Sequence, residues 1–397
     1  MAAMSMRISK FFAPEIIFGV GALGQIGESA IRLGATKLFV VSDPGVVSFG
    51  WVEETLKHLR ESGLSFEVWF EVTPNPKDQE ILKGTERYLA SGCDAILAVG
   101  GGSPIDAAKG IAILATNGGI IQDYEGVNKI FAPLPPLIAV PTTAGSGSEV
   151  SQFAIIVDSR RKVKMAIISK SLVPDIAIID PVVLQTKDAK LTAATGLDAL
   201  CHAIESFVSL AATPLTDVHA LKAINLIARF LRPSVACRTN LEAKAAMAMA
   251  ALQAGLAFSN AILGATHAMA HQLGAWLDLP HGETCAVLLP YVMEYNLNAC
   301  PERFALIAEA LGEYRHGLTV WQAAEKAIET VKKLVRDLNI PEYISVEDLT
   351  DEQLKLLAQN ALRDACLITN PSDLAEQELM NLFKMVLRKK GGNAGVS

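Results

Sequence analysis

Short apolar runs alternate with segments of helical spacing through the first half of the chain. Four short apolar runs predict strands, at 37–42, 66–70, 95–99 and 137–140. The segments 52–60 and 77–90, and a third that starts at Pro104, repeat apolar residues at the spacing of a helix. Strands that alternate with helices in this way predict a doubly wound, mainly parallel sheet with helices on both faces.

The pattern changes after Asp180-Pro181, where the strand signals stop. Helix-like segments follow at 191–231, 241–277, 302–311, 320–338 and 354–367. We therefore predict an α/β domain at 1–185 and an all-α domain at 186–397. More than 20 residues between Lys244 and His267 carry no charge, but polar residues within this stretch favour a helix buried in a soluble domain over a membrane span.

Composition narrows the functional classes. The chain has 397 residues, of which 51% are hydrophobic and 19% charged, so it can bury a large core. With 35 basic and 42 acidic residues the net charge is −7, which argues against nucleic acid and anionic membranes as partners. Six cysteines without a C-x-x-C pair favour a reduced, cytoplasmic location, and Pro14-Glu15 leaves no room for the apolar core of a secretion signal.

The first glycine-rich motif is a misleading one. Residues 19–24 (GVGALG) match the dinucleotide fingerprint G-x-G-x-x-G, and Asp43 lies about 20 residues further on. Only the short apolar stretch 16–18 precedes the motif, where the fingerprint requires a full strand. We therefore interpret it as a plain turn into the first helix.

The second glycine-rich motif, Gly100-Gly101-Gly102-Ser103-Pro104, follows the strongest strand signal and begins a helix. Backbone N–H groups and the helix dipole bind phosphate groups at such a point. Residues 141–149 (PTTAGSGSE) follow the next strand and add small hydroxyls, so two neighbouring loops would suit a dinucleotide. The alternative is a tight turn in which Ser103 only caps the helix.

Asp43 lies at the end of the predicted strand 37–42. A carboxylate there would accept hydrogen bonds from both ribose hydroxyls of NAD and repel the 2′-phosphate of NADP, so it predicts NAD. It would serve equally well as a turn aspartate before Pro44.

Candidate metal ligands gather between residues 198 and 281. Asp198 and His202 are four residues apart on one helix, and His267 and His271 repeat that spacing on another, so each pair shares a helix face. Together with His281 they predict a mononuclear site with nitrogen and oxygen ligands and no sulfur, which suits Fe(II) and Zn(II) equally. Three other histidines are interpreted as surface or structural residues: His58, His219 and His316.

These residues resemble a known family, the iron-dependent alcohol dehydrogenases, which includes lactaldehyde reductases and propanediol and butanol dehydrogenases. The resemblance rests on 194–205 (ATGLDALCHAIE), 267–271 (HAMAH) and 280–282 (PHG). It extends to 100–104, 141–145 and 364–371, and so covers nearly the whole chain. Two positions depart from the family pattern: Gln272 stands where many members have proline, and Ser372 where many have arginine.

The resemblance implies an NAD-dependent enzyme that interconverts small alcohols and aldehydes. We also predict a homodimer or a larger homo-oligomer. The resemblance implies that iron is held by Asp198, His202, His267 and His281, with His271 left free for catalysis. The residues that it implies around NAD are Gly101, Gly102, Ser103, Thr142, Thr143, Ser146 and Lys164. Those that it implies around the substrate are Phe258, Leu263 and Cys366, of which the cysteine is equally well read as a small buried hydrophobe.

The expected chemistry follows from charge. A divalent cation lowers the pKa of a bound alcohol, so hydride transfer to nicotinamide becomes feasible near neutral pH. His271 would then relay the proton to solvent.

Three alternatives stay open. The first is a zinc-dependent polyol dehydrogenase of the glycerol type, for which the resemblance implies three protein ligands, so that His202 favours iron. The second is a regulatory protein that keeps the metal and cofactor without catalysis. The third is a lyase of the dehydroquinate synthase type, which would need more basic groups than these motifs contain.

Overall fold

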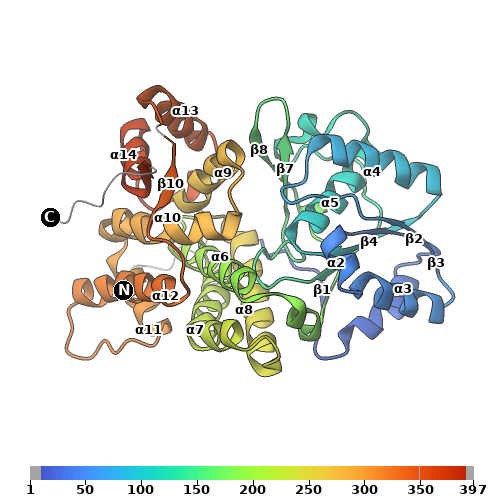
Figure 1. Cartoon of the computed structure of the whole chain (residues 1–397), viewed down its shortest axis with the longest axis horizontal. Coiled ribbons are helices and arrows are strands. Elements are labelled where there is room, and N and C mark those ends of the chain that lie inside the picture. The colour runs from blue at the N-terminus through green and yellow to red at the C-terminus, as the bar shows by residue number, and fades with distance from the viewer. Residues whose placement is uncertain (1–9, 348, 390–397) are drawn as a thin grey trace.

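The computed structural model describes residues 10–347 and 349–389 and has two halves of different architecture (Figure 1). The first half contains a six-stranded parallel sheet with the strand order β1-β9-β6-β4-β2-β3. Its strands are β1 (Glu15–Phe18), β2 (Lys37–Val41), β3 (Ser65–Trp69), β4 (Ala95–Gly100), β6 (Leu137–Pro141) and β9 (Ile176–Ile179). The four strands predicted from the sequence correspond to β2, β3, β4 and β6.

Helices cover both faces of this sheet. They are α1 (Ile26–Arg32), α2 (Pro44–Ser48), α3 (Trp51–Glu61), α4 (Asp78–Ser91) and α5 (Gly102–Asn117). Side chains of β2 alternate between two cores: Leu38 and Val40 pack with α1 and α3, whereas Phe39 and Val41 pack with α4 and α5. The predicted doubly wound architecture is confirmed.

A three-stranded sheet that we did not predict lies between the two halves (Figure 1). It consists of β5 (Gly126–Val127), β7 (Phe153–Asp158) and β8 (Val163–Ile168). Strands β7 and β8 form an antiparallel hairpin, in whose turn the Asp158 carboxylate accepts hydrogen bonds from the N–H groups of Arg160 and Arg161. Because β7 contacts α5 and β8 contacts α9, the hairpin connects the sheet half to the helical half.

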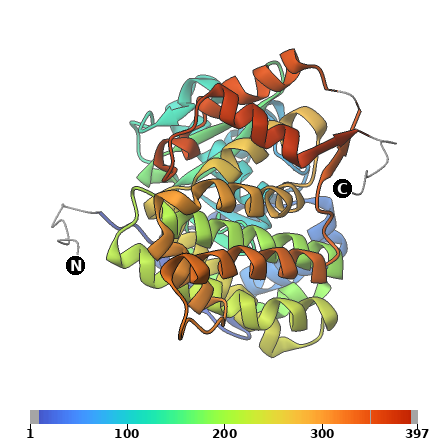
Figure 2. The same ribbon diagram turned by 90° about the vertical axis from the view of Figure 1, so that its left-hand side faces the viewer.

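The second half is helical, as predicted, and Figure 2 looks onto several of its helices running side by side. The helices are α6 (Ala189–Val208), α7 (Pro214–Ala236), α8 (Leu241–Ala261), α9 (Ala265–Leu277), α10 (His281–Asn296), α11 (Pro301–Ala310), α12 (Val320–Asp337), α13 (Asp351–Leu362) and α14 (Glu376–Val386). Helix α6 packs against α7, α8 and α10, and nearly all of its residues after 192 are buried. Its polar side chains therefore face protein rather than solvent.

The two longest predicted helices are each interrupted. The segment 191–231 breaks before α7, which begins at Pro214 with Thr213 as its N-cap. The segment 241–277 breaks where Ile262 takes a φ of 61°, and the chain bends by 101° between α8 and α9. The uncharged stretch is thus two helices rather than one. In the described ranges no single helix has the length and apolarity to span a membrane, although this bent pair does when its two helices are counted together.

Several elements were missed by the sequence analysis. Helix α10 contains Gly282 and Pro290, residues that normally interrupt a helical pattern, and α14 was also missed. A small parallel sheet of β10 (Ile344–Val346) and β11 (Leu387–Lys389) corrects the expectation that strands stop after residue 181. Short 3-10 helices occur at Ala22–Gln25, Ile121–Tyr124, Lys170–Leu172, Pro181–Thr186, Leu297–Ala299 and Ala365–Thr369.

The topology brings the two later glycine-rich loops together. Strands β4 and β6 are neighbours, and both loops leave from the carboxyl ends of these strands. In open parallel sheets this edge is where ligands bind. The helical half borders the same edge through α6 and α8, so both domains contribute to one region.

Candidate metal centre and cofactor loops

Backbone N–H groups of the glycine motif at 19–24 already donate to a carboxylate of the same chain. The backbone N–H groups of Gly21 and Leu23 donate to Oδ2 of Asp180, at 2.9 and 3.3 Å. A phosphate would compete with this carboxylate for the same donors and would be repelled by its charge. The structure therefore agrees with a plain turn here, although a genuine short strand, β1, precedes it.

The loops at 100–104 and 141–149 lie against each other. The N–H of Thr142 donates to the carbonyl of Gly100 at 2.9 Å. A Cβ on Gly102 would lie 3.0 Å from the Cβ of Ser146, so glycine at this position lets the loops touch. Helix α5 starts at Gly102 with Gly101 as its N-cap, and no side chain caps it, which corrects the alternative that Ser103 is the cap. An uncapped helix start of this kind fits a pyrophosphate.

The second loop also contacts the helical half. Gly147 has a φ of +62°, and a Cβ there would lie 2.6 Å from the Cα of Gly255 on α8. Only glycine fits this conformation and this approach. The carbonyl of Gly145 accepts a hydrogen bond from Nδ1 of His202 at 3.2 Å. The candidate cofactor loop is thus in direct contact with a candidate metal ligand.

Asp43 is the N-cap of α2. Its Oδ1 accepts a hydrogen bond from the N–H of Val46 at 2.9 Å, which is the turn role considered from the sequence. This bond engages one oxygen of a half-buried carboxylate, so it is compatible with a ribose contact through the other oxygen. Lys187 lies near Asp43: burial lowers the pKa of this lysine, while the charge of Asp43 opposes the shift.

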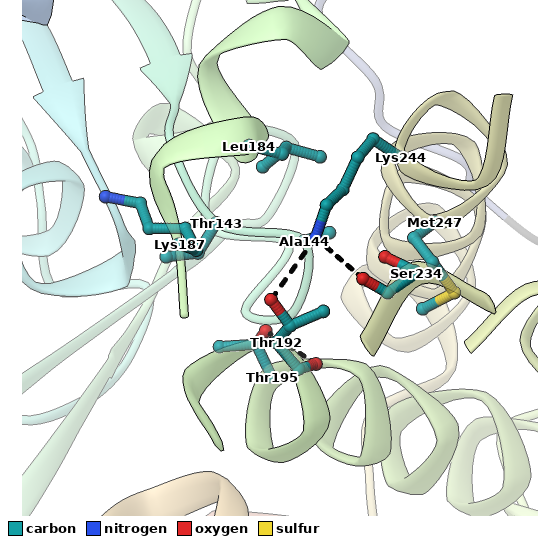
Figure 3. Close-up of a pocket in the computed structure, with 9 residues that line it drawn as sticks. All are labelled: Thr143, Ala144, Leu184, Lys187, Thr192, Thr195, Ser234, Lys244 and Met247. Carbon is teal, nitrogen blue, oxygen red and sulfur yellow. Dashed lines mark hydrogen bonds between the residues drawn. The ribbon is translucent and has the colours of Figure 1, made fainter. Parts of the chain in front are cut away.

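A pocket lies beside the second loop, between the two halves (Figure 3). Thr143 and Lys187 line it from the sheet side, and Lys244 reaches in from α8. The Nζ of Lys244 donates to Oγ1 of Thr192 at 3.3 Å and to the carbonyl of Ser234 at 3.0 Å. This pocket adjoins the cofactor loop and does not include the candidate metal ligands.

Three of the four predicted metal ligands lie on three different helices and come together: Asp198 on α6, His267 on α9 and His281 on α10. Oδ1 of Asp198 lies 3.8 Å from Nε2 of His267 and 3.7 Å from Nε2 of His281. Within the described ranges, Oδ1 of Asp198 and Nε2 of His267 are buried side-chain atoms without a hydrogen-bond partner. Leaving such atoms unpaired is costly, and a divalent cation between them would remove that cost. The donor set therefore fits a metal ion.

His202, the fourth predicted ligand, is placed differently. Its ring stacks on those of His267 and Phe258, with centroids 4.5 and 4.4 Å apart, but it is not among the residues whose ligand atoms converge. Because a carbonyl only accepts, Nδ1 of His202 carries the proton and Nε2 keeps its lone pair. Burial lowers the pKa of His202 to about 4, so the ring is neutral, as a ligand must be.

The charge state of Asp198 also suits a ligand. Burial alone would raise the pKa of this carboxyl, but the electrostatic interaction with the imidazoles of His202 and His281 and the contact with His267 outweigh burial and hold the pKa well below its usual range. Burial lowers the pKa of His281. The site thus contains an ionised carboxylate beside the neutral rings of His202 and His281. Burial would lower the pKa of His267 as well, but its contacts with Cys285, Asp198 and Glu205 raise that pKa instead.

A buried carboxylate orients His267. Nδ1–H of His267 donates to Oε2 of Glu205 at 2.5 Å, and the other oxygen of Glu205 accepts from the N–H of Thr266 at 2.6 Å. This bond leaves Nε2 of His267 free for a metal, which is the arrangement that supports histidine ligands in many metalloproteins. Sequence reasoning gave Glu205 no role, although it lies seven residues after Asp198 on the same face of α6.

His271 has a different carboxylate partner. Its Nδ1–H donates to Oδ2 of Asp364 at 2.8 Å, and Oδ1 of Asp364 accepts from the N–H of Cys366 at 2.9 Å. Burial would raise the pKa of Asp364, but the charge and the hydrogen bond of His271 lower it. The His271 ring stacks against that of His281, with centroids 5.6 Å apart. His271 therefore borders the convergent cluster without joining it.

The cluster contains a residue that the predicted ligand set does not include. Sγ of Cys285 lies with the ligand atoms of Asp198, His267 and His281, all within 4.8 Å of one another, so a sulfur atom lies among the ligand atoms that were predicted to include none. Burial raises the pKa of the thiol to about 11. The available signal was the spacing of Cys285 four residues after His281, the same as in the two pairs that we did identify.

The predicted substrate residues are Phe258, Leu263 and Cys366. All three lie in one buried apolar cluster, which also contains Phe153, Ile168 and Ala268. Since His202 stacks on Phe258, this cluster borders the candidate metal site. The predicted cofactor residue Lys164 is buried on β8, with a pKa lowered by burial, and its Nζ lies beside Gly274 of α9.

The remaining residues singled out from the sequence either form hydrogen bonds that involve a backbone carbonyl or lie outside the cluster. Gln272 donates to the carbonyl of Ala268, and the carbonyl of Ser372 accepts from Asn370. Outside the cluster, His58 lies between Glu54 and Glu61, His219 pairs with Gln253, and His316 is exposed, as expected.

Comparison with known proteins agrees with this geometry. Residues 13–181 match the family described as iron-containing alcohol dehydrogenase, and residues 192–387 match the C-terminal part of the Fe-containing alcohol dehydrogenase family. A 1,3-propanediol dehydrogenase of Citrobacter freundii is 44% identical over 96% of this chain and 99% of its own length. An NAD-dependent methanol dehydrogenase of Bacillus methanolicus is 41% identical over 95% of this chain and 99% of its own.

The fold is shared as well. The crystal structure of a 1,3-propanediol oxidoreductase superposes with a TM-score of 0.92 at 43% identity, covering 96% of this chain and all of that one. The chain therefore belongs to the iron-containing alcohol dehydrogenase family that its motifs resemble, and it is an oxidoreductase that acts on CH–OH groups.

Proposed function

We propose that this protein transfers hydride between NAD(H) and a short primary alcohol or diol, or the corresponding aldehyde, at an iron site held by Asp198, His202, His267 and His281. The observation that carries the proposal is the pair of buried, unpartnered donor atoms, Oδ1 of Asp198 and Nε2 of His267. Relatives named for propanediol and methanol oxidation support the substrate class.

The cofactor half of the proposal rests on the two neighbouring loops. The uncapped start of α5 would bind the pyrophosphate through Gly101, Gly102 and Ser103. Thr142, Thr143 and Ser146 would contact the same cofactor from the second loop, and the buried Lys164 would approach it from β8. Asp43 would accept the ribose hydroxyls, which favours NAD over NADP.

The hydrogen bond from His202 to Gly145 joins the two halves of the site. When bound, iron would supply Lewis acidity that lowers the pKa of the substrate hydroxyl. His271, oriented by Asp364, would accept the released proton and pass it toward solvent. Phe258, Leu263 and Cys366 would provide an apolar wall that excludes water from the reacting carbon.

Metal analysis tests this proposal directly. The protein would be purified without oxygen, assayed for metal, and tested in NADH-linked assays with short alcohols, diols and aldehydes. Chelation should abolish activity, and Fe(II) should restore more of it than Zn(II). Full activity with stoichiometric zinc would contradict the iron assignment, and inactivity of the metal-loaded enzyme across the whole panel would contradict the substrate class.

A zinc-dependent polyol dehydrogenase is the second candidate, and one observation favours it. Sulfur is a common zinc ligand, and Cys285 places a thiol within the cluster. The same metal analysis separates the two candidates.

We also propose a cytoplasmic location and assembly into a homodimer or larger homo-oligomer. None of the six cysteines, all of which lie in the described ranges, forms a disulfide, which suits a reducing compartment. Light scattering on the purified protein tests the assembly: a monomeric mass would contradict it.

A further inference from the structure

Cys285 lies one turn after His281 on α10, and its side chain is fully buried. Its Sγ is 3.7 Å from Nε2 of His281. It also lies within 4.8 Å of the ligand atoms of Asp198 and His267. The thiol therefore faces the same point as the predicted oxygen and nitrogen ligands.

A second observation shows that this point is suited to a cation. Oδ1 of Asp198 and Nε2 of His267 are buried without partners, and the two residues are only 5% and 1% exposed. Burial alone does not bring a cysteine among these ligand atoms. Cys201, on α6 between Asp198 and His202, is also fully buried but does not belong to the convergent group.

We propose that Cys285 is a sulfur donor of this metal site and that it favours thiophilic divalent cations, Zn²⁺ and Co²⁺, over Fe²⁺. The inference rests on the proposed metal site and adds a residue to it. When such a cation enters, the S–H proton leaves to solvent and the sulfur lone pair forms the metal–sulfur bond, with no change in oxidation state. Thiolate is a softer ligand than imidazole or carboxylate, so it stabilises Zn²⁺ more than Fe²⁺. The proposal concerns metal affinity, and the relative activity of the iron and zinc forms is a separate quantity.

Cobalt provides the direct readout. The metal-free protein, prepared with a chelator, would be loaded with Co²⁺ and examined for the near-ultraviolet charge-transfer absorption of a thiolate–cobalt bond. The wild type should show this band. Cys285→Ser and Cys285→Ala should bind cobalt without it, and the matched control Cys201→Ala should keep it.

Affinity provides the second readout. Competition with a chromogenic chelator should show that Cys285→Ala lowers zinc affinity by at least the roughly 10- to 100-fold known for groups that only orient a metal ligand. Iron affinity should change much less. Melting curves of the variants establish that they are folded, and Cys285→Ser keeps nearly the same volume.

The outcomes are distinguishable. A wild-type cobalt protein without the band, or a band that persists in both Cys285 variants, would overturn the sulfur ligand while leaving the iron site intact. A wild type that binds no metal would overturn both proposals. X-ray absorption of the wild-type zinc protein decides the matter even if neither variant folds, because a Zn–S distance of about 2.3 Å is either present or absent.

Discussion

His267 and His271 lie one turn apart on α9, yet their surroundings are different. Nδ1–H of His267 donates to Glu205 on α6, and its Nε2 faces Asp198. Nδ1–H of His271 donates to Asp364, and its ring only borders the cluster. Each histidine is oriented by a buried carboxylate, but only one of them has its second nitrogen among the convergent ligand atoms. The comparison teaches that identical helical spacing does not decide which histidine binds metal; the partners on other elements do.

The largest expected effect is that of His267→Ala. Removing one member of a small ligand set leaves too few donors to hold a divalent ion against water, so the variant should lose its metal and all measurable activity. Metal content per chain is the measurement. His219→Ala, which breaks a pair with Gln253 away from the cluster, is the control and should keep its metal. Iron retained at full occupancy in His267→Ala would refute the assignment of roles.

His271→Ala should differ from His267→Ala in that it keeps its metal. We expect metal content near that of the wild type, turnover lower by about 10²- to 10⁴-fold, and a flatter dependence of turnover on pH, as for a lost proton relay. Steady-state kinetics across pH, with metal analysis of the same samples, provide the test. An iron-free His271→Ala protein would exchange the roles of the two histidines.

Glu205→Gln tests whether the carboxylate acts through His267. Two groups, Nδ1–H of His267 and the N–H of Thr266, donate to Glu205, and an amide offers one oxygen for them. Metal affinity should fall by about 10- to 100-fold. The matched change Asp364→Asn should leave metal affinity unaltered, since His271 is the histidine that Asp364 orients. Equal losses of metal in both variants would mean that the two pairs are not distinct.

Asp43→Gly should have the smallest effect and should leave both histidine pairs unaltered. Loss of a charged hydrogen-bond acceptor should weaken NAD binding by about tenfold and relax the bias against NADP. Glycine is a tolerated N-cap, so α2 should persist. Cofactor titrations and metal content are the measurements. A wild type that already uses NADP as well as NAD would show that Asp43 does not bind the ribose.

Local sequence patterns predicted much of the fold. The apolar runs of β2, β3, β4 and β6 and the helical spacing of α3 and α4 are properties of neighbouring residues, so they can be read without a structure. Elements that depend on distant partners were missed. The hairpin of β7 and β8 is held between α5 and α9, and α10 continues through Pro290 because it packs against α6, α9 and α12. The domain boundary near residue 185 stays a prediction.

The amino-acid sequence by itself determined the alternating α/β order, the helical second half, the glycine loop at 100–104 and the family to which the chain belongs. Only the tertiary structure decided that Asp180 fills the first glycine motif, and that Glu205 and Asp364, which are 62 and 93 positions from their histidines, give those histidines different surroundings. Helical periodicity relates residues a few positions apart, whereas a metal site is made by side chains that approach from separate elements. That is also why Cys285, which has the same four-residue spacing as the recognised pairs, became visible as a donor only when α10 was seen beside α6 and α9.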